Sequence, residues 1–128
     1  MGEHYRIVLA ALAGVLIGSG VATALAQSQA FDPPRVAPHI FEVALENERV
    51  RVLRVTERHG ETQPLHRLRD RVEVYLSNCA WMVEEEDGSA RMEGYRVGDV
   101  VWRAGVARGG RTSNVIDACV SLAIELKD

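Results

Sequence analysis

Apolar and polar residues alternate along most of the chain from residue 40 onward. The clearest case is the segment 71–77, where Val72, Val74 and Leu76 fall on one face of an extended strand and Arg71, Glu73, Tyr75 and Ser77 fall on the other. The last apolar segment, 119–127, alternates in the same way, with Val120, Leu122, Ile124 and Leu126 in phase. A period of two is the period of a β-strand, so both segments are predicted to be strands.

Shorter alternating segments lie around these two, and turn residues separate them. Strands are expected near residues 40–45, 49–56, 62–68, 80–86, 90–93 and 100–103. Asp87-Gly88 is a strong hairpin signal, and Val97-Gly98-Asp99 marks another tight turn. No segment after residue 26 has a convincing helical period. About eight short strands in about a hundred residues predict an all-β sandwich or barrel and fit a jelly roll.

The first 26 residues differ in kind from the rest. Residues 7–26 carry no charge and end in Ala24-Leu25-Ala26, a small-x-small sequence of the type that signal peptidase cleaves. This predicts a signal peptide over residues 1–26. An uncleaved membrane anchor over residues 7–26 is the alternative, because about twenty apolar residues can span a bilayer. Both interpretations place the remainder in the periplasm or in the medium, with the membrane as a partner only through an uncleaved segment.

The region after the signal is expected to contain one folded domain. Residues 27–39 are polar and contain Pro33, Pro34 and Pro38, which is typical of an extended linker. Residues 40–128 then form the domain, since a chain of 128 residues is long enough for one domain and not for two.

The composition is that of a globular protein, with 47% hydrophobic and 26% charged residues. The net charge is −3, from 15 basic and 18 acidic residues, and this lack of a basic excess argues against a nucleic-acid partner. The two tryptophans, Trp81 and Trp102, are expected in the core or in the barrel wall.

Export would give a role to the two cysteines, Cys79 and Cys119. In an oxidising compartment they can form a disulfide that closes a loop of about forty residues, worth about 3–4 kcal/mol in the chain-entropy model. The alternative is a pair of separate small core thiols. Sequence spacing leaves both interpretations open, because it does not give the distance between the two Cα atoms.

The segment 60–80 resembles the first motif of small single-domain cupins. That motif contains a glycine, a spaced His-x-His pair, a glutamate and a closing glycine. Here Gly60, His66 and Glu73 stand at the matching positions, Leu68 replaces the second histidine, and Ala80 replaces the closing glycine.

The second cupin motif also has a counterpart, in the sequence YRVGDVVW. Gly98-Asp99 resembles its glycine–aspartate turn, with Ala104 where proline usually follows. The motif's histidine falls near residues 108–110, which are Arg108, Gly109 and Gly110, and Asn114 stands near the position of the closing asparagine. Over residues 40–127 the resemblance implies the double-stranded β-helix of cupins and a homodimer that pairs through edge strands.

Cupin metal sites hold a divalent metal with three histidines and one glutamate. Carried over position by position, the resemblance leaves only His66 and Glu73 as metal ligands. The leucine at the second histidine position cannot bind a metal, and Arg108 is a permanent cation that repels one. His39 and His59 are the histidines that remain as substitutes. We therefore expect a mostly lost metal site, with a metal held by His66 and Glu73 as the alternative.

Polar residues on the Glu73 face of the strand are expected to line the mouth of the barrel. The candidate ligand-binding residues are His66, Arg71, Glu73, Tyr75 and Arg108. Arginine binds carboxylates and phosphates through paired N–H groups, so this set suits a small anionic molecule. Two plainer interpretations stay open: Arg71 pairs with Glu73, and His66 is a hydrogen-bonded core histidine.

Function remains open between two classes. The first is an exported cupin-fold module that binds a small ligand or acts as an interaction scaffold. The second is a metal-dependent cupin enzyme of the oxygenase or isomerase class. The sequence has no Gly-x-Ser-x-Gly elbow, phosphate loop, CxxC or nucleotide fingerprint, so no complete catalytic constellation identifies an enzyme.

Overall fold

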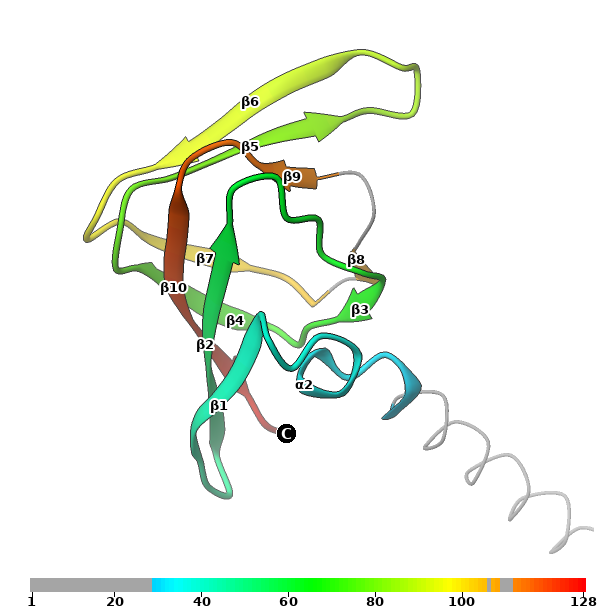
Figure 1. Cartoon of the computed structure of the whole chain (residues 1–128). Coiled ribbons are helices and arrows are strands. Elements are labelled where there is room, and N and C mark those ends of the chain that lie inside the picture. Colours follow the sequence, from blue (N-terminus) through cyan, green and yellow to red (C-terminus); the bar gives the residue numbers. More distant parts are fainter. Residues whose placement is uncertain (1–28, 106, 109–111) are drawn as a thin grey trace, which may run out of the picture. The chain divides into compact units, whose positions relative to one another are not determined.

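The computed structural model describes residues 29–105, 107–108 and 112–128 (Figure 1). The chain divides into two compact units, Met1–Ala30 and Phe31–Asp128, and the second contains all of the strands described below. No helix within the described ranges is long and apolar enough to cross a membrane. The predicted signal peptide or anchor, residues 1–26, lies outside the described residues.

Antiparallel strands form the larger sheet of the second unit. Its five strands lie in the order β1-β2-β10-β4-β7. Their bounds are β1 Phe41–Glu46, β2 Val50–Arg58, β10 Ala118–Leu126, β4 Arg71–Tyr75 and β7 Val100–Arg103. The last strand, β10, lies in the middle of the sheet, between β2 and β4. The strands predicted at both strongly alternating segments are therefore present, and they pair with each other.

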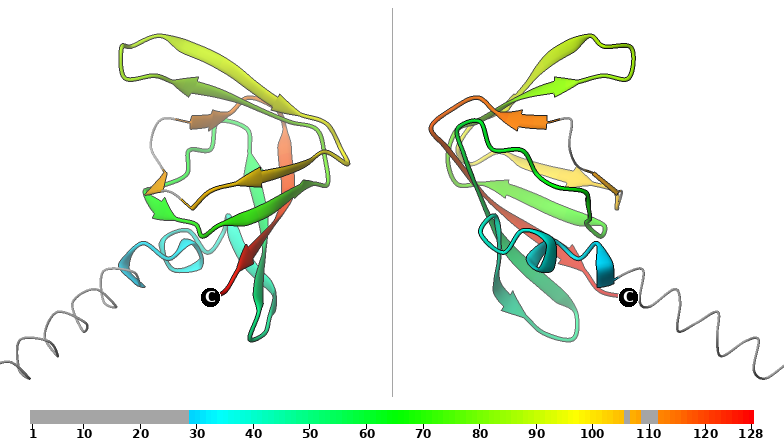
Figure 2. Two further views of the ribbon diagram at one scale, coloured as in Figure 1. Left: turned by 180° about the vertical axis from the view of Figure 1, so that it is seen from behind. Right: turned by 45° about the vertical axis from the view of Figure 1, so that its right-hand side comes forward.

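A smaller sheet contains β6 (Ala90–Tyr95), β5 (Cys79–Glu84) and β9 (Thr112–Asn114), in that order. A short ladder joins β3 (His66–Arg67) to β8 (Ala107–Arg108). β5 and β6 form the hairpin predicted at Asp87-Gly88, where Gly88 has a φ of 83°, a conformation that glycine adopts most easily. Figure 2 shows the sheets in two further views. The all-β prediction is confirmed.

A short helix stands where the sequence suggested an extended linker. α2 covers Pro33–Val36 and begins with proline, whose missing N–H costs no helical hydrogen bond at this position. Directly after it, Ala37 is fully buried and packs in the core with Ile40 and Phe41. A single helical turn is too short to leave a period in the sequence, so only the prolines were visible there. The packed part of the chain thus begins before Ile40.

Two clusters of buried side chains make up the core. The first contains Ala37, Ile40, Phe41, Leu53, Val55, Leu68 and Ala123, and the second contains Tyr75, Cys79, Trp81 and Cys119. Cys79 and Cys119 form a disulfide that ties β5 to β10. Of the two interpretations left open by the sequence, the structure shows the disulfide. Trp81 is a core residue as predicted, whereas Trp102 is 56% exposed.

On β4 and β10 the larger sheet turns charged, polar and small side chains inward and its large aliphatic side chains outward. Along β10 the buried side chains are Cys119, Ser121, Ala123 and Glu125, while the half-exposed or exposed ones are Val120, Leu122, Ile124 and Leu126. The register places Glu73 opposite Ala123 on the inner face, and Val72 opposite Ile124 on the outer face. A strand that covers a core normally turns its apolar side chains inward. The reversed arrangement gives the space between the sheets its charge.

Candidate ligand-binding pocket

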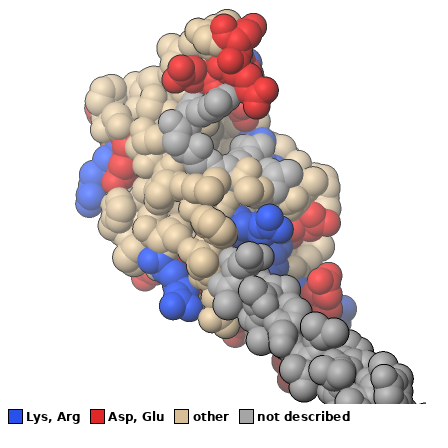
Figure 3. All heavy atoms as spheres, turned by 90° about the vertical axis from the view of Figure 1, so that its right-hand side faces the viewer, with Lys and Arg blue, Asp and Glu red and all other residues tan. Residues whose placement is uncertain are grey.

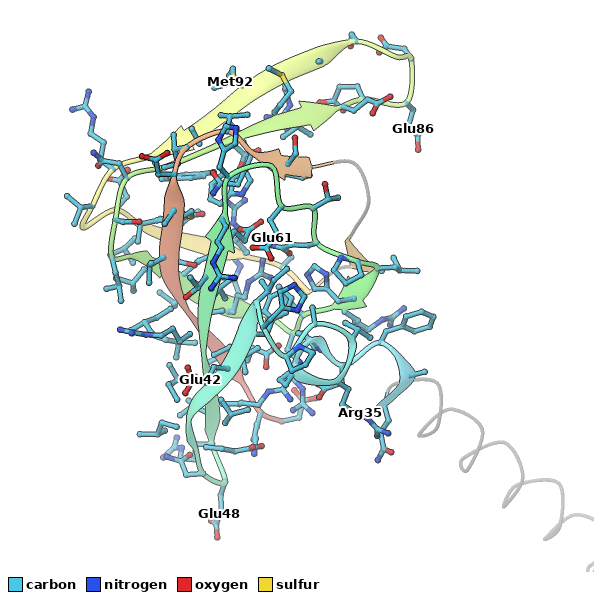
Figure 4. The ribbon with its side chains drawn as sticks, viewed as in Figure 1. Arg35, Glu42, Glu48, Glu61, Glu86 and Met92 are labelled. Atoms are coloured by element: carbon cyan, nitrogen blue, oxygen red, sulfur yellow. A yellow bond between two sulfur atoms is a disulfide. The ribbon has the colours of Figure 1, made fainter. Side chains whose placement is uncertain are left out.

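A pocket of about 310 Å³ lies between the two sheets. The larger sheet contributes Glu57, Arg71, Glu73, Tyr75 and Arg103, the smaller sheet contributes Trp81, Val83, Arg91, Glu93 and Thr112, and Gln63 comes from the segment after β2. Side chains from both sheets fill the space between them (Figure 4). A pocket of this size accommodates a small organic molecule.

Two arginines converge on one carboxylate in this pocket. Arg71 on β4 and Arg103 on β7 are direct cross-strand partners. Glu73 Oε2 lies 3.1 Å from Arg103 Nε and 3.5 Å from Arg71 Nη2. The Arg71 side chain is only 2% exposed, so its charge lies inside the protein. The pairing of Arg71 with Glu73, which the sequence left open, is therefore present, but Glu73 is shared with a second arginine.

Arg103 also binds the aromatic side of the pocket. Its Nη2 group donates hydrogen bonds to the Tyr95 hydroxyl at 2.8 Å, the Tyr75 hydroxyl at 3.1 Å and Glu93 Oε1 at 3.2 Å. The guanidinium also lies over the Tyr95 ring, 5.1 Å from its centroid. Burial lowers the pKa of Arg103. The hydrogen bond to Tyr75 and the nearby Glu73 carboxylate raise this pKa by more, so that it lies above the ordinary value. Arg103 is thus a fixed cation.

Three aromatic rings form a packed wall beside the arginines. The Tyr75 and Tyr95 rings stack with centroids 4.4 Å apart, and the Trp81 ring stands edge-on to both. Burial raises the pKa of Tyr75, and the negative charge of Glu73 raises it further. The Tyr75 phenol therefore stays protonated, and its oxygen accepts the hydrogen bond from Arg103.

Glu57 is the most deeply buried carboxyl group of the pocket, with 1% of the residue exposed. Its Oε2 accepts a hydrogen bond from Trp81 Nε1 at 3.1 Å, and its Oε1 has no partner of good geometry among the described residues. Burial raises the pKa of Glu57 to about 6, against the opposing effect of the nearby Gln63 and Trp81 side chains. This carboxyl group therefore exchanges a proton close to neutral pH.

Three arginines and three glutamates line the pocket. Arg91 is 54% exposed and pairs with Glu85 at 2.6 Å and Glu93 at 3.0 Å. It belongs to the β5–β6 hairpin, over whose tip acidic side chains gather on the face shown in Figure 3. Arg71 and Arg103 are the more deeply buried arginines, at 2% and 14% side-chain exposure, so they are the cations that an enclosed ligand would meet.

His66 does not join Arg71, Glu73 and Tyr75 in lining the pocket. It is fully buried on β3, its Nδ1 lies 2.7 Å from the Pro64 carbonyl oxygen, and its ring centroid is 4.9 Å from that of Phe41. A carbonyl oxygen only accepts hydrogen bonds, so Nδ1 carries the proton. His66 is not among the described residues that line the pocket. Its surroundings match the interpretation of a hydrogen-bonded core histidine.

The two metal ligands carried over from the cupin motif, His66 and Glu73, make other contacts in this structure. Nδ1 of His66 is engaged with a carbonyl group, and Glu73 Oε2 is engaged with two arginines. Leu68, at the second histidine position, is buried in the core. Within the described ranges, no three histidine, cysteine, aspartate or glutamate side chains are grouped as metal ligands.

The structure describes only the backbone of Arg108. This backbone pairs with His66 across the β3–β8 ladder. The structure thus brings together Arg71, Glu73 and Tyr75 out of the five residues expected from the sequence. The side chain of Arg108 lies outside the description, and its place in the pocket stays a prediction.

Two central residues of the pocket were missed from the sequence. Glu57 follows Leu53 and Val55 on the inner face of β2, and a carboxylate in phase with buried residues was a usable signal. Arg103 follows Val101 on the inner face of β7, but this strand is too short for its phase to indicate which side is buried.

Comparisons with known proteins agree with this architecture. No protein-family model matches the sequence, and no curated protein sequence matches it. Among solved structures, a cupin domain from Bordetella pertussis Tohama I is similar over 70% of this chain and 93% of its own, with 26% identity and a TM-score of 0.53. An RmlC-like cupin family protein with a double-stranded β-helix fold, from Methanocaldococcus jannaschii, is similar over 68% of this chain and 78% of its own, with 16% identity and a TM-score of 0.50.

The chain is thus similar in fold to these two cupin structures. The expectation from the motifs at Gly60 and Gly98-Asp99 is therefore confirmed for the fold. The described chain has the fold of a small cupin domain.

Proposed function

We propose that this protein is an exported cupin-fold binding module that holds a small molecule through an anionic group, a carboxylate or a phosphate. The observation that carries the proposal is the convergence of Arg71 and Arg103 on Glu73 Oε2, inside a pocket of about 310 Å³. Guanidinium groups bind carboxylates and phosphates in bidentate fashion.

Arg103 keeps donors for a ligand. Arg103 uses Nε and Nη2 in its hydrogen bonds to protein, and none of the described residues accepts a bond from its Nη1. A guanidinium has more N–H donors than these bonds occupy. An anion seated beside Glu73 would gain the Nη1 donors and the field of the neighbouring Arg71.

The remaining lining defines the rest of the ligand. Trp81 and Tyr75 offer apolar ring surface, and Glu57 offers a carboxyl group that donates when protonated and accepts when ionised. A small organic acid or phosphate ester with a hydroxyl or amino group fits these partners. The alternative metal-dependent enzyme would need ligands that the described residues do not bring together.

A thermal-shift screen tests the anionic ligand. Small carboxylates, inorganic phosphate and phosphate esters should raise Tm at pH 6, and neutral amides of the same acids should not. Arg103→Gln should abolish the shift, while Arg54→Gln, which removes an exposed arginine from β2, should retain it. If none of the acids tested changes the Tm of the wild type, the proposal is wrong.

Export needs its own test. The full-length chain, expressed in a bacterium and fractionated, should yield a periplasmic protein whose intact mass corresponds to residues 27–128. Membrane-bound protein at the full-length mass would assign residues 7–26 to an anchor, and protein retained in the cytoplasm would contradict export.

A further inference from the structure

Three glutamates line the pocket, and two of them have arginine partners. Glu73 forms ion pairs with Arg71 and Arg103, and Glu93 forms another with Arg103. Glu57 takes part in none of the ion pairs that the described residues form with one another. The pocket therefore contains one acidic group that has no cationic partner within the described part of the chain.

The contacts of the Glu57 carboxyl group are with neutral groups. Its Oε2 accepts a hydrogen bond from Trp81 Nε1 at 3.1 Å, the Gln63 side chain lies beside it, and its cross-strand partner Cys119 is held in the disulfide. Its Oε1 has no partner of good geometry among the described residues, although Glu57 is only 1% exposed. Because buried polar atoms in proteins are almost always hydrogen-bonded, this oxygen is placed to accept a hydrogen bond from a ligand.

The neighbouring charges that shift the pKa of Glu57 are negative. Burial raises this pKa most, and the charges of Glu73 on β4 and of Glu61, which follows β2, raise it further. A second negative group at this end of the pocket would meet the same repulsion. A positively charged group would lower the pKa of Glu57 and stabilise its ionised form. The electrostatic field around Glu57 therefore favours a cation.

Two aromatic rings stand between Glu57 and the cationic end of the pocket. Arg103 Nη2 donates a hydrogen bond to the Tyr75 hydroxyl at 3.1 Å, and Trp81 Nε1 donates one to Glu57. Between these contacts the Tyr75 and Trp81 rings lie edge-on, with their centroids 6.0 Å apart. A molecule that reaches from Arg103 to Glu57 therefore has its two ends several bonds apart, with an apolar middle that packs on the rings.

We propose that the ligand is a short ω-amino acid, whose carboxylate binds Arg103 and whose ammonium group binds Glu57. This inference rests on the anion-binding function proposed above and names the class of molecule. An ammonium group has three N–H donors, and its bond to a carboxylate is of the strong, charge-assisted kind. The faces of the Trp81 and Tyr75 rings also attract a cation. Three arginines and three glutamates line the pocket, so a ligand without net charge matches an electrically balanced lining.

Calorimetric titration of the exported protein at pH 7 tests the proposal with a matched series of probes. The probes are γ-aminobutyrate, δ-aminovalerate and ε-aminocaproate, each compared with the unsubstituted acid of the same length. We expect at least one amino acid to bind about tenfold more tightly than its matched acid, because it gains the contact with Glu57. Butylamine, which lacks the carboxylate, and glycine, whose charges are too close together, should bind more weakly than that amino acid.

Two variants assign the two ends of the ligand. Glu57→Gln should bind each amino acid no more tightly than its matched acid, while the affinity for the acids is retained, because the amide can still accept the Trp81 hydrogen bond. Arg103→Gln should weaken the binding of both series. Glu48→Gln removes an exposed carboxylate from the β1–β2 turn and should preserve the preference for the amino acid. Far-ultraviolet circular dichroism establishes that each variant is folded.

The pH dependence gives a second measurement that needs no variant. Both charges of an ω-amino acid persist from pH 5.5 to pH 8. Its ammonium group needs the ionised form of Glu57, so binding should tighten as pH rises through about 6, the pKa of this group, and should release protons near pH 6. Titrations in two buffers with different ionisation enthalpies measure this release. Sulfate, which carries no positive charge, should show the opposite trend.

The outcomes separate this inference from the proposed function. If the unsubstituted acids bind as tightly as the amino acids, the inference is wrong and the anion site stands. If neither series binds to the wild type, the anion-binding function is wrong as well. A preference for the amino acid that persists in Glu57→Gln, or an affinity for it that falls as pH rises through about 6, also overturns the inference.

Discussion

Arg71 and Arg103 lie directly opposite each other on β4 and β7, and Glu73 binds both of them through a single oxygen. Like charges on directly opposite strand positions repel, and burial strengthens the repulsion. The Glu73 carboxylate offsets it from within the pocket. The stability of the barrel and its affinity for anions are therefore linked through the same three side chains.

Removal of the Glu73 charge should expose this link. We expect Glu73→Gln to lower the free energy of unfolding by about 3 kcal/mol, because it removes the carboxylate shared by the two guanidinium groups, although Arg103 keeps its ion pair with Glu93. Sulfate should restore part of the loss. Urea unfolding, with and without sulfate, measures both effects, and Glu48→Gln in the exposed β1–β2 turn serves as the control. Equal sulfate stabilisation of Glu73→Gln and the wild type would contradict the proposed role.

Glu57 should make the protein less stable as pH rises. The pKa of Glu57 is about 6 in the folded state against an ordinary value of 4.5, so the folded state holds the proton more tightly. Its contribution is fully present below pH 4.5 and is lost as pH rises through about 6, a change of about 2 kcal/mol.

Glu57→Gln isolates this contribution, because the neutral amide can still accept the Trp81 hydrogen bond. The difference in unfolding free energy between the variant and the wild type should grow in favour of the variant from pH 4.5 to pH 7.5. Guanidinium unfolding at several pH values measures it. A difference that does not change with pH would show that Glu57 does not titrate in this range.

Anion binding should strengthen as pH falls. Protonation of Glu57 turns a lining of three arginines and three glutamates into one with a net positive charge. Sulfate keeps its charge from pH 5.5 to pH 8, so any change in its affinity comes from the protein. Calorimetry should find several-fold tighter binding at pH 5.5 than at pH 8. Glu57→Gln should bind sulfate with the same affinity at both values.

Reduction of the Cys79–Cys119 disulfide should destabilise the domain. The bridge joins residues 40 positions apart, which gives about 4 kcal/mol in the chain-entropy model. The Tm of the wild type should fall when a reductant is added, and the Cys79→Ser/Cys119→Ser variant should already show the lower Tm and no further change. Alkylation followed by mass spectrometry reports the redox state. A Tm that is insensitive to reductant would contradict the prediction.

Much of the fold could be predicted, because the alternation of apolar and polar residues is a local property of the sequence. Segments 71–77 and 119–127 show their two faces directly in the sequence, and the motif positions at Gly60 and Gly98-Asp99 supplied the cupin expectation. Alternation does not show which face of a strand points into the protein and which points to solvent. Here Val72 and Ile124 point outward while Arg71 and Glu125 point inward, the reverse of the usual order.

The pocket could be predicted only in part, because its lining residues come from seven separate segments of the chain. Arg71, Glu73 and Tyr75 share one strand and were found together. Arg103 meets Glu73 only through the pairing of β4 with β7, which no local pattern in the sequence reveals. His66 was expected beside Glu73 from the motif, but its ring turns to Phe41 and to the Pro64 carbonyl group.

The disulfide has a topological consequence for a cleaved chain. It closes a covalent ring from Cys79 to Cys119 that contains Trp81, Arg103 and the whole β5–β6 hairpin. A protease that cuts once anywhere inside this ring leaves both fragments joined as one molecule. Such a nicked protein keeps every side chain that lines the pocket, and its two fragments separate only when a reductant opens the ring.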